Sequence, residues 1–130
     1  MKMNRDHLTP FPIQVGELLT SILPASGNSK YIFPNEKDPN KPMHSENVNK
    51  AIRRIQGGKY IGKIVSHGFR SMASTILNES GKFPVDVIEK QLAHRKTNSV
   101  RSAYNHAQYL DERIEMIQWY ADFLDKALES

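Results

Sequence analysis

The sequence predicts one mainly α-helical domain with a small β-hairpin at its N-terminus. Three observations support this fold class. Apolar residues recur at steps of three and four along several stretches, residues that favour helix ends bracket those stretches, and only residues 1–10 have the pattern of a hairpin. The 130 residues, 38% hydrophobic and 25% charged, suit one globular domain with a core of its own.

The hairpin is predicted from a polar turn near the start of the chain. The turn residues Asn4–Asp6 separate Lys2 and Met3 from His7–Thr9, and Pro10 follows. A disordered terminus is the alternative, because Lys2 is the second residue present.

Residues 11–44 predict a short helix followed by an exposed loop. The helix should end before Pro24, because proline disrupts a helix interior. Its apolar side chains are Ile13, Leu18, Leu19 and Ile22. The polar, proline-rich stretch 35–42 (NEKDPNKP) should lack regular structure. Lys37 and Lys41 in this loop either contact phosphate groups or are simply solvated.

Residues 45–56 predict an amphipathic helix, capped by Ser45 and stopped by the Gly57-Gly58 pair. The side chains expected to face inward are Val48, Ala51, Ile52 and Ile55. Those expected to face outward are Asn47, Asn49, Lys50, Arg53 and Arg54. Such an outer face suits the groove of a nucleic acid and its flanking phosphates. A solvated face is the ordinary alternative.

A second helix is predicted from Ser66 to the stop at Gly81. One apolar stripe should face the core, formed by Phe69, Met72, Ala73, Ile76 and Leu77. His67 and Arg70 lie three residues apart and leave the helix at neighbouring points beside the stripe. On their own they fit a surface His and Arg on a half-buried helix better than a catalytic pair.

Two short helices are predicted to follow. The first starts at Pro84 and buries one side, formed by Val85, Ile88 and Leu92, and His94 comes just past its end. The second is capped by Thr97 or Asn98 and carries Val100, Ala103 and Tyr104 on one face. The segment 59–65 (KYIGKIV) is either a buried connector or a phosphate contact.

Residues 111–130 predict a long helix with acidic residues in its first turn, which complement the helix dipole. Its main apolar stripe is Ile114, Ile117, Ala121, Leu124 and Leu128, widened by Met116, Trp119, Tyr120 and Phe123. This is more apolar surface than one packing partner usually needs. The helix therefore docks either on the core of its own chain or on a neighbouring protomer.

Charge is distributed unevenly along the chain, which has a net charge of +4. Residues 1–70 carry 11 Lys and Arg against 5 Asp and Glu, whereas residues 111–130 carry 2 against 6. The basic part is expected to face an anionic partner, and the acidic end is not. The absence of cysteine excludes disulfides and thiolate metal sites. No membrane span or signal peptide is evident, so we expect a soluble, cytoplasmic protein.

The ordered set His67-x-x-Arg70, His94 and Tyr104 resembles the catalytic signature of the tyrosine recombinases, the phage integrase family. The surrounding stretches HGFRSMASTILNE, VIEKQLAH and NSVRSAYNHAQYLDER are similar to prophage-type integrases, and the resemblance covers nearly all of residues 60–125. It implies the helical catalytic fold of that family, with the hairpin as the remnant of a short sheet. The helix at 45–56 would then enter the major groove, through Asn47, Lys50, Arg53 and Arg54.

The resemblance also implies site-specific DNA recombination, as in prophage integration and excision, through a 3′-phosphotyrosine. Tyr104 would attack the phosphate, with His67 and His94 as proton acceptors or hydrogen-bond donors. Lys2 would act on the leaving oxygen, because its spacing to Pro10 fits the family's hairpin lysine. The expected partners are DNA attachment sites and other protomers, four on DNA, held in part through residues 111–130. No metal or other cofactor is implied.

The chemistry of phosphodiester cleavage explains why these residue types suit the task. Attack by a tyrosine oxygen concentrates negative charge on two non-bridging oxygens, which the guanidinium of Arg70 can hold in a bidentate manner. A tyrosine with an ordinary pKa of about 10 must lose its proton as it attacks, so a nearby histidine is useful. Tyr109 is a rival nucleophile and His106 a rival base, although core packing suits Tyr109 better.

One departure from the family pattern is important. The family uses two catalytic arginines, and the first lies upstream of the hairpin lysine. Arg5 lies after Lys2 in the sequence, so it cannot be the first catalytic arginine. We therefore expect residues 1–130 to be the C-terminal part of a catalytic domain, with a hairpin at 1–10, DNA-facing and catalytic helices at 45–110 and a C-terminal helix at 111–130. Such a chain should be inactive alone. The alternative is a non-catalytic DNA-binding or protein-interaction remnant.

Overall fold

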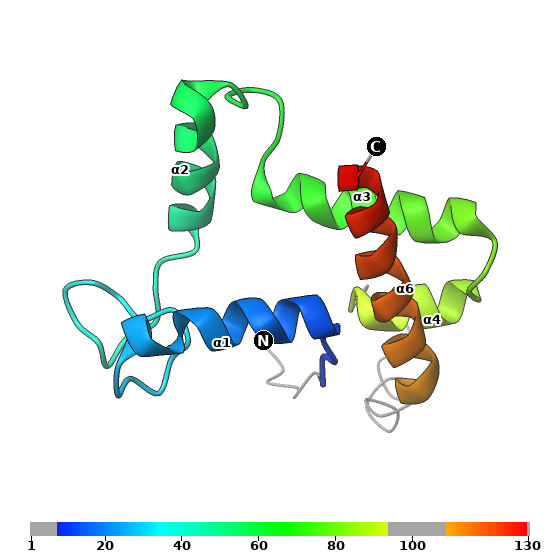
Figure 1. The fold of residues 1–130 in the computed structure, drawn as a ribbon, viewed down its shortest axis with the longest axis horizontal. Helices are drawn as coiled ribbons and strands as arrows, with labels where there is room; N and C mark the ends of the chain where they lie inside the picture. The colour runs from blue at the N-terminus through cyan, green and yellow to red at the C-terminus, as the bar shows by residue number, and fades with distance from the viewer. Residues whose placement is uncertain (1–7, 94–108, 130) are drawn as a thin grey trace, which may run out of the picture. The chain divides into compact units, whose positions relative to one another are not determined.

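The regular secondary structure of the protein is helical in the residues that its computed structural model describes, 8–93 and 109–129. The helices are α1 (Ile13–Ser26), α2 (Glu46–Arg54), the 3-10 turn η1 (Ile55–Gly58), α3 (Ser66–Ser80), α4 (Val85–Gln91) and α6 (Leu110–Glu129) (Figure 1). Among the described residues, β pairing is limited to one isolated bridge between Pro34 and Pro42. The mainly α prediction is confirmed.

The predicted N-terminal hairpin is not supported. Most of it, residues 1–7, lies outside the described residues, and residues 8–10 form no strand. No helix within the described ranges is long and apolar enough to cross a membrane.

The chain divides into two compact units, and each is considered separately. Unit 1 consists of Met1–Ile13 and Ala73–Ser130, and unit 2 consists of Gln14–Met72. The division falls inside α3, so the first turns of that helix belong to unit 2 and the remainder to unit 1.

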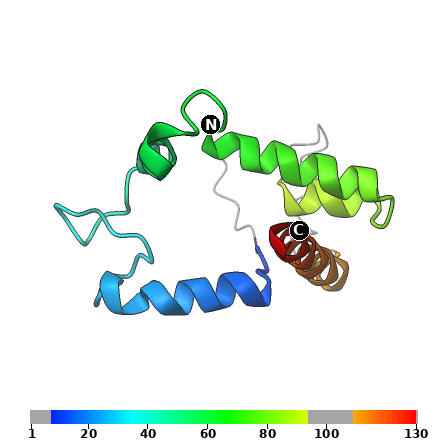
Figure 2. The ribbon, with the colours of Figure 1, turned by 45° about the horizontal axis from the view of Figure 1, so that its top comes forward.

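Unit 1 contains the buried core. Leu77 of α3, Val87 and Ile88 of α4 and Met116 of α6 form one cluster. Both ribbon views show α4 beside the second half of α3 (Figures 1 and 2). The half-buried side chains around the cluster are Phe83, Leu92, Tyr109, Trp119 and Tyr120. The predicted face of α4 was partly wrong, because Val85 is 59% exposed and Val87 is buried in its place.

The buried face of α6 also differs from the predicted stripe. Arg113, Met116 and Ile117 are buried, whereas Ile114 is 46% and Leu128 84% exposed. The buried residues follow the three-and-four spacing of a helix face, but that face begins with a charged residue. The predicted stripe included Ile114 and Leu128 and omitted Arg113, so it differs in part from the side of the helix that is buried.

In unit 2, α1 continues through Pro24 to Ser26, contrary to the predicted stop before the proline. Proline removes one helix hydrogen bond, and water can replace it on an exposed helix. Hydroxyl groups also bond within the helix, because Thr20 Oγ1 donates to the Gly16 carbonyl at 2.8 Å. The chain leaves the helix through Gly27, whose φ of 61° favours glycine.

The loop between α1 and α2 is irregular, as predicted, but it is organised by local hydrogen bonds. The Asn35 side chain accepts from the Lys37 amide at 2.9 Å and the Asp38 amide at 3.4 Å. The Asn35 amide donates to the Lys41 carbonyl at 2.9 Å. The Lys41 ammonium also lies 4.0 Å from the Asp38 carboxylate, an exposed pair that contributes little.

The hydrophobic faces predicted for α2 and the start of α3 are largely exposed. Ile52 of α2 is buried, but Val48 is 41% and Ile55 47% exposed. Phe69 of α3 is 47% exposed, whereas Leu77, near the end of the same helix, is buried in the unit 1 core. The stripe was therefore predicted correctly only where α4 and α6 cover it.

Candidate functional site

The first turn of α3 carries two of the predicted catalytic residues. His67 is exposed and Arg70 is half-buried, and their spacing of three residues puts both side chains on neighbouring positions of the helix surface. The backbone enters this turn through a hydrogen bond from the Gly68 amide to the Val65 carbonyl, at 2.9 Å. An imidazole and a guanidinium are thus presented together by one rigid element.

A side chain from α2 holds the start of α3. The Ser66 amide donates to Asn49 Oδ1 at 2.8 Å. The first amides of a helix have no partner inside the helix, so this bond satisfies one of them. Asn49 was expected to face outward and is instead half-buried. Asn49 therefore links α2, which carries the basic side chains, to the start of α3, which carries His67 and Arg70.

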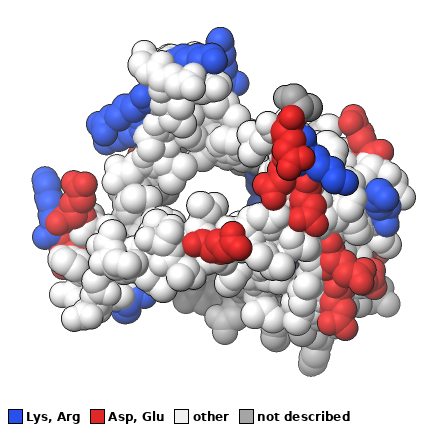
Figure 3. Space-filling view, viewed as in Figure 1, with Lys and Arg blue, Asp and Glu red and all other residues white. Residues whose placement is uncertain are grey.

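The outer face of α2 is basic and accessible. Figure 3 shows Lys and Arg gathered over this helix. The four predicted DNA-binding residues are all exposed: Asn47, Lys50, Arg53 and Arg54. They lie three or four residues apart, on one broad side. Arg53 and Arg54 occupy the last turn, where positive charge complements the helix dipole.

The start of α2 is capped differently from the prediction. Ser45 occupies the N-cap position, but its side chain makes no capping hydrogen bond. Instead the ring nitrogen Nδ1 of His44 accepts from the Glu46 amide at 3.2 Å, and the His44 carbonyl accepts from the Asn47 amide at 3.0 Å. His44, the residue before Ser45, therefore accepts the capping hydrogen bonds at the start of α2.

A tight turn joins α2 to α3. Gly58 has a φ of 95°, and a β-carbon added to it would lie 3.0 Å from Ile61 Cδ1. The conformation therefore favours glycine, whereas the exposed Ile61 side chain could move aside for a β-carbon. The turn continues with a hydrogen bond from the Lys63 amide to the Tyr60 carbonyl at 3.0 Å, and Lys59 Nζ lies 5.6 Å from the centre of the Tyr60 ring.

The other predicted catalytic residues lie outside the described residues. These are Lys2, His94 and Tyr104, together with the rival base His106. The backbone on either side of residues 94–108 is described. Ala93 has a φ of 53° at the end of α4, and Tyr109 has a φ of 62° at the start of α6. Both conformations are uncommon for residues with a side chain and mark sharp changes in chain direction.

Tyr109, the rival nucleophile, packs against the unit 1 core. Its carbonyl accepts a hydrogen bond from the Arg113 amide at 2.7 Å, which starts α6. This position agrees with the structural role that the sequence favoured for Tyr109.

Arg113 is a site-flanking residue that the sequence analysis missed. Its side chain is fully buried. Nε donates to Gln91 Oε1 at 2.9 Å, and Nη2 donates to the Leu8 carbonyl at 2.6 Å. Burial lowers the pKa of the guanidinium below its ordinary value. The signal in the sequence was its position three and four residues before Met116 and Ile117, on the face that proved to be buried.

Within residues 8–93 and 109–129, no group of three or more His, Cys, Asp or Glu side chains is placed to hold a metal ion. The imidazole, guanidinium and ammonium groups of the described site can bind anions, and the imidazole can also transfer a proton.

Comparison with known proteins identifies the family. The family model of the phage integrase family matches residues 1–111, so the chain belongs to that family and the resemblance seen in the sequence is confirmed. The match includes His67, Arg70, His94 and Tyr104. No solved structure gives a significant match.

Several prophage and phage integrases are similar to almost the whole chain. Prophage integrase IntA of Escherichia coli K12 is 50% identical over 127 residues, which are 98% of this chain and 30% of that protein. The integrase of Enterobacteria phage P4 is 42% identical over 96% of the chain and 28% of its own length. The integrase of Shigella phage Sf6 is 45% identical over 97% and 32%. The chain thus spans about 30% of the length of such relatives.

Proposed function

We propose that this chain is the C-terminal part of the catalytic domain of a tyrosine recombinase, which cuts and rejoins DNA during prophage integration and excision. The observation that carries the proposal is the family match across residues 1–111, which contains His67, Arg70, His94 and Tyr104 in the family's order. Relatives named as prophage integrases, up to 50% identical, support it.

The first turn of α3 provides the phosphate-binding part of the proposed site. The Arg70 guanidinium holds two non-bridging oxygens of the phosphate, where negative charge accumulates during attack. His67, three residues earlier and exposed, donates a hydrogen bond to the same phosphate or accepts a proton from the nucleophile. The tie from Asn49 to the Ser66 amide supports this role, because it restrains the turn that carries both side chains.

The proposed reaction proceeds in two balanced steps. The Tyr104 oxygen forms a bond to phosphorus and passes its proton to His67 or His94. The bond from phosphorus to the 5′ oxygen breaks, and that oxygen takes a proton from Lys2. A 5′ hydroxyl from another strand then attacks the 3′-phosphotyrosine and gives its proton to Lys2, while the released Tyr104 oxygen takes back the proton held by His67 or His94. The covalent intermediate conserves the energy of the phosphodiester bond, so neither a nucleotide nor a metal is required.

The exposed side of α2 is the proposed DNA-reading surface. Asn47 and Lys50 suit contacts in the major groove, and Arg53 and Arg54 suit either bases or flanking phosphates. Their exposure supports this role, because no rearrangement is needed before contact. The DNA partner is a double-stranded attachment site, and the protein acts in the cytoplasm.

Assembly with other protomers is proposed to involve α6. One side of this helix packs on the core of its own chain, as one of the two sequence alternatives stated. Ile114, Phe123 and Leu128 remain exposed on α6, and they form the apolar part of the proposed contact within a tetramer on DNA.

A second candidate function is non-catalytic DNA binding. The exposed basic side of α2 favours it, because that surface requires neither Tyr104 nor Lys2. DNA binding that depends on α2, without a covalent product, is the expected behaviour of such a remnant.

Covalent trapping separates the two functions. Nicked suicide duplexes of randomised sequence are incubated with this chain, and with a chimaera in which the chain replaces the matching 30% of prophage integrase IntA. We expect a DNA-linked protein band on a denaturing gel from the chimaera and little or none from the chain alone. Tyr104→Phe should reduce the band at least about a hundredfold, and Tyr109→Phe should leave it unchanged.

The binding arm of the same experiment tests the alternative. Arg53→Ala with Arg54→Ala should weaken DNA binding and flatten its dependence on salt, because two phosphate-binding charges are removed. Binding that is lost in this variant, with no covalent band from any protein, would favour the remnant. A band that persists in Tyr104→Phe and disappears in Tyr109→Phe would identify Tyr109, not Tyr104, as the nucleophile.

A further inference from the structure

Arg113 is the charged residue most completely removed from solvent among the described residues, with an exposed fraction of 0%. It lies in the first turn of α6, next to the buried cluster that contains Met116. A guanidinium loses much hydration when it is buried, and a well-packed apolar residue often costs less at such a position. The burial of Arg113 is therefore explained by the hydrogen bonds that its side chain makes rather than by packing alone.

The Arg113 side chain connects three separate stretches of the chain, all in unit 1. It leaves α6, donates to the Gln91 side chain at the end of α4, and donates to the Leu8 carbonyl in the segment before α1. Leu8 and Arg113 are 105 residues apart in sequence, and the Leu8 bond is the shorter of the two, at 2.6 Å. Hydrogen bonds to a charged donor are stronger than neutral ones and cost more when broken.

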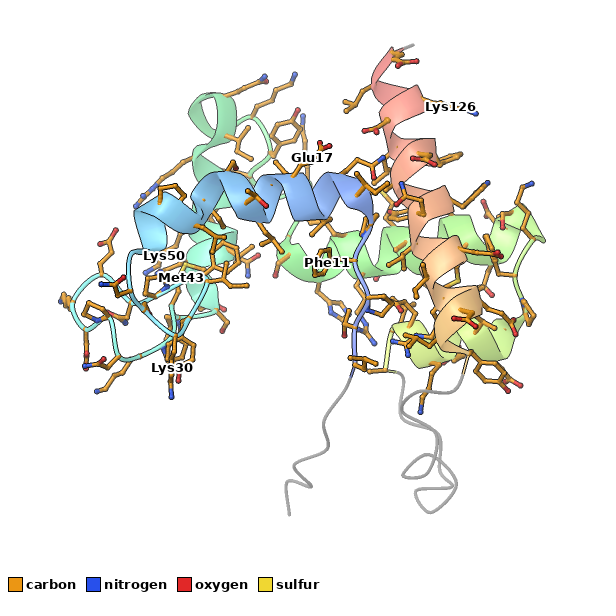
Figure 4. The ribbon with its side chains drawn as sticks, turned by 60° about the horizontal axis from the view of Figure 1, so that its bottom comes forward. Phe11, Glu17, Lys30, Met43, Lys50 and Lys126 are labelled. Atoms are coloured by element: carbon orange, nitrogen blue, oxygen red, sulfur yellow. The ribbon has the colours of Figure 1, made fainter. Side chains whose placement is uncertain are left out.

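A second bond reinforces the contact between the N-terminal segment and α6. The Ile13 amide donates to Gln118 Oε1 at 3.0 Å. Arg113 and Gln118 are five residues apart on α6, so this helix holds residues 8–13 at two points. Figure 4 shows this segment, with Phe11 labelled, leading into α1.

Each stretch that Arg113 joins leads to a residue of the proposed reaction. Leu8 follows Lys2 by six residues, Gln91 precedes His94 by three, and Arg113 follows Tyr104 by nine. Three residues of extended chain span at most about 11 Å, so an anchor at Gln91 limits the space open to the residues that follow it.

We propose that Arg113 is a positioning residue, which ties together the three backbone segments that lead to Lys2, His94 and Tyr104. The inference rests on the proposed function for its catalytic consequence, and on the contacts of Arg113 for the tie itself. The planar guanidinium has five N–H donors at fixed angles and reaches two acceptors in different directions. A lysine keeps the charge but has a single nitrogen, so it cannot make both bonds in the same geometry.

Hydrogen–deuterium exchange of the 130-residue chain tests the tie without any catalytic assay. Arg113→Lys should make peptides covering residues 8–13, which include the Ile13 amide bonded to Gln118, and residues 85–93 exchange at least about fivefold faster, because lysine cannot reproduce the two bonds that restrain these segments. Lys126→Ala is the matched control, since Lys126 is an exposed cation that projects from the other end of α6 (Figure 4). This control should leave the exchange of both peptides unchanged.

A conservative second substitution gives a selective rescue. Adding Gln91→Glu to Arg113→Lys places a carboxylate where the new ammonium can meet it. Protection should return in residues 85–93 and not in residues 8–13, because the Leu8 contact is still missing. If Arg113→Lys fails to fold, Gln91→Met removes one contact at similar volume, and only the α4 peptide should then exchange faster.

The catalytic consequence is measured in the chimaera that forms the covalent band. Arg113→Lys should lower the single-turnover rate of band formation at least about tenfold, with DNA affinity changed less than about twofold. A structural defect alone would reduce both. Unchanged exchange in residues 8–13 and 85–93 would overturn the tie. Faster exchange with an unchanged rate of cleavage would overturn the positioning role. A chimaera that forms no band with any sequence would overturn the proposed function, and the exchange result would still decide the tie.

Discussion

Unit 1 and unit 2 are built on different physical principles. Unit 1 has a cluster of four fully buried side chains from three helices, and it also buries the guanidinium of Arg113. In unit 2, as far as its residues are described, Ile52 is the one buried hydrophobic side chain. Its loop and helix starts are held instead by hydrogen bonds that backbone amides donate to the side chains of Asn35, His44 and Asn49.

The difference teaches how stability and contact surface are divided along this chain. Burial of apolar side chains is the dominant stabilising term, so unit 1 should be the more stable part. Unit 2 carries the exposed basic side chains of α2 and the His67–Arg70 turn. A surface that must meet DNA keeps its side chains accessible and gains its order from specific polar contacts.

The largest expected effect is in unit 1. Met116→Ala removes a fully buried side chain from the cluster, and it should lower the free energy of unfolding by about 2–5 kcal/mol. Chemical denaturation followed by circular dichroism measures the change. Leu128→Ala is the control, since Leu128 is 84% exposed on the same helix, and its cost should stay below about 0.5 kcal/mol.

A smaller effect is expected for the single buried hydrophobic residue of unit 2. Ile52→Ala should cost about 1–2 kcal/mol, because Ile52 is 7% exposed and the neighbouring Val48 and Ile55 are open to water. Amide exchange of α2 measures this local stability. A cost equal to that of Met116→Ala would contradict the contrast between the two units.

The smallest effect concerns the polar tie between α2 and α3. Asn49→Ala removes the acceptor of the Ser66 amide, so the start of α3 should lose about 1 kcal/mol. The exchange rate of the Ser66 amide, measured by NMR, reports the loss. Asn47→Ala, two residues earlier and exposed, is the matched control. If both variants exchange alike at Ser66, hydrogen bonding is not what orders this part of unit 2.

The sequence predicted those features of the fold that repeat along a helix or depend on its ends. Periodicity and helix-end residues identified α2, α3, α4 and α6, and the order of four polar residues identified the family. The predicted helix end before Pro24 is wrong because an exposed helix can tolerate the hydrogen bond that proline removes. Val85 was predicted to be buried, but Val87 is buried instead. In so short a helix, the apolar spacing alone does not determine which side faces the core.

The candidate site was predictable in residue type but only partly in its supporting contacts. His67 and Arg70 lie together on the first turn of α3, as their spacing predicts. Asn49 and Arg113 were missed because their partners, Ser66, Gln91 and Leu8, are 17 to 105 residues away. Hydrogen bonds over such separations leave no periodic signal, and a polar side chain is assigned to the surface by default.

The bond from Arg113 to the Leu8 carbonyl has a practical consequence for protein engineering. An affinity tag or fluorescent protein joined to Met1 would be attached seven residues from a carbonyl that a buried cation requires. The opposite end of the chain offers a safer attachment point, because Leu128 is 84% exposed. Tags and surface linkers on the 130-residue chain therefore belong after α6, whereas an integrase segment joined upstream must leave residues 8–13 able to reach α6.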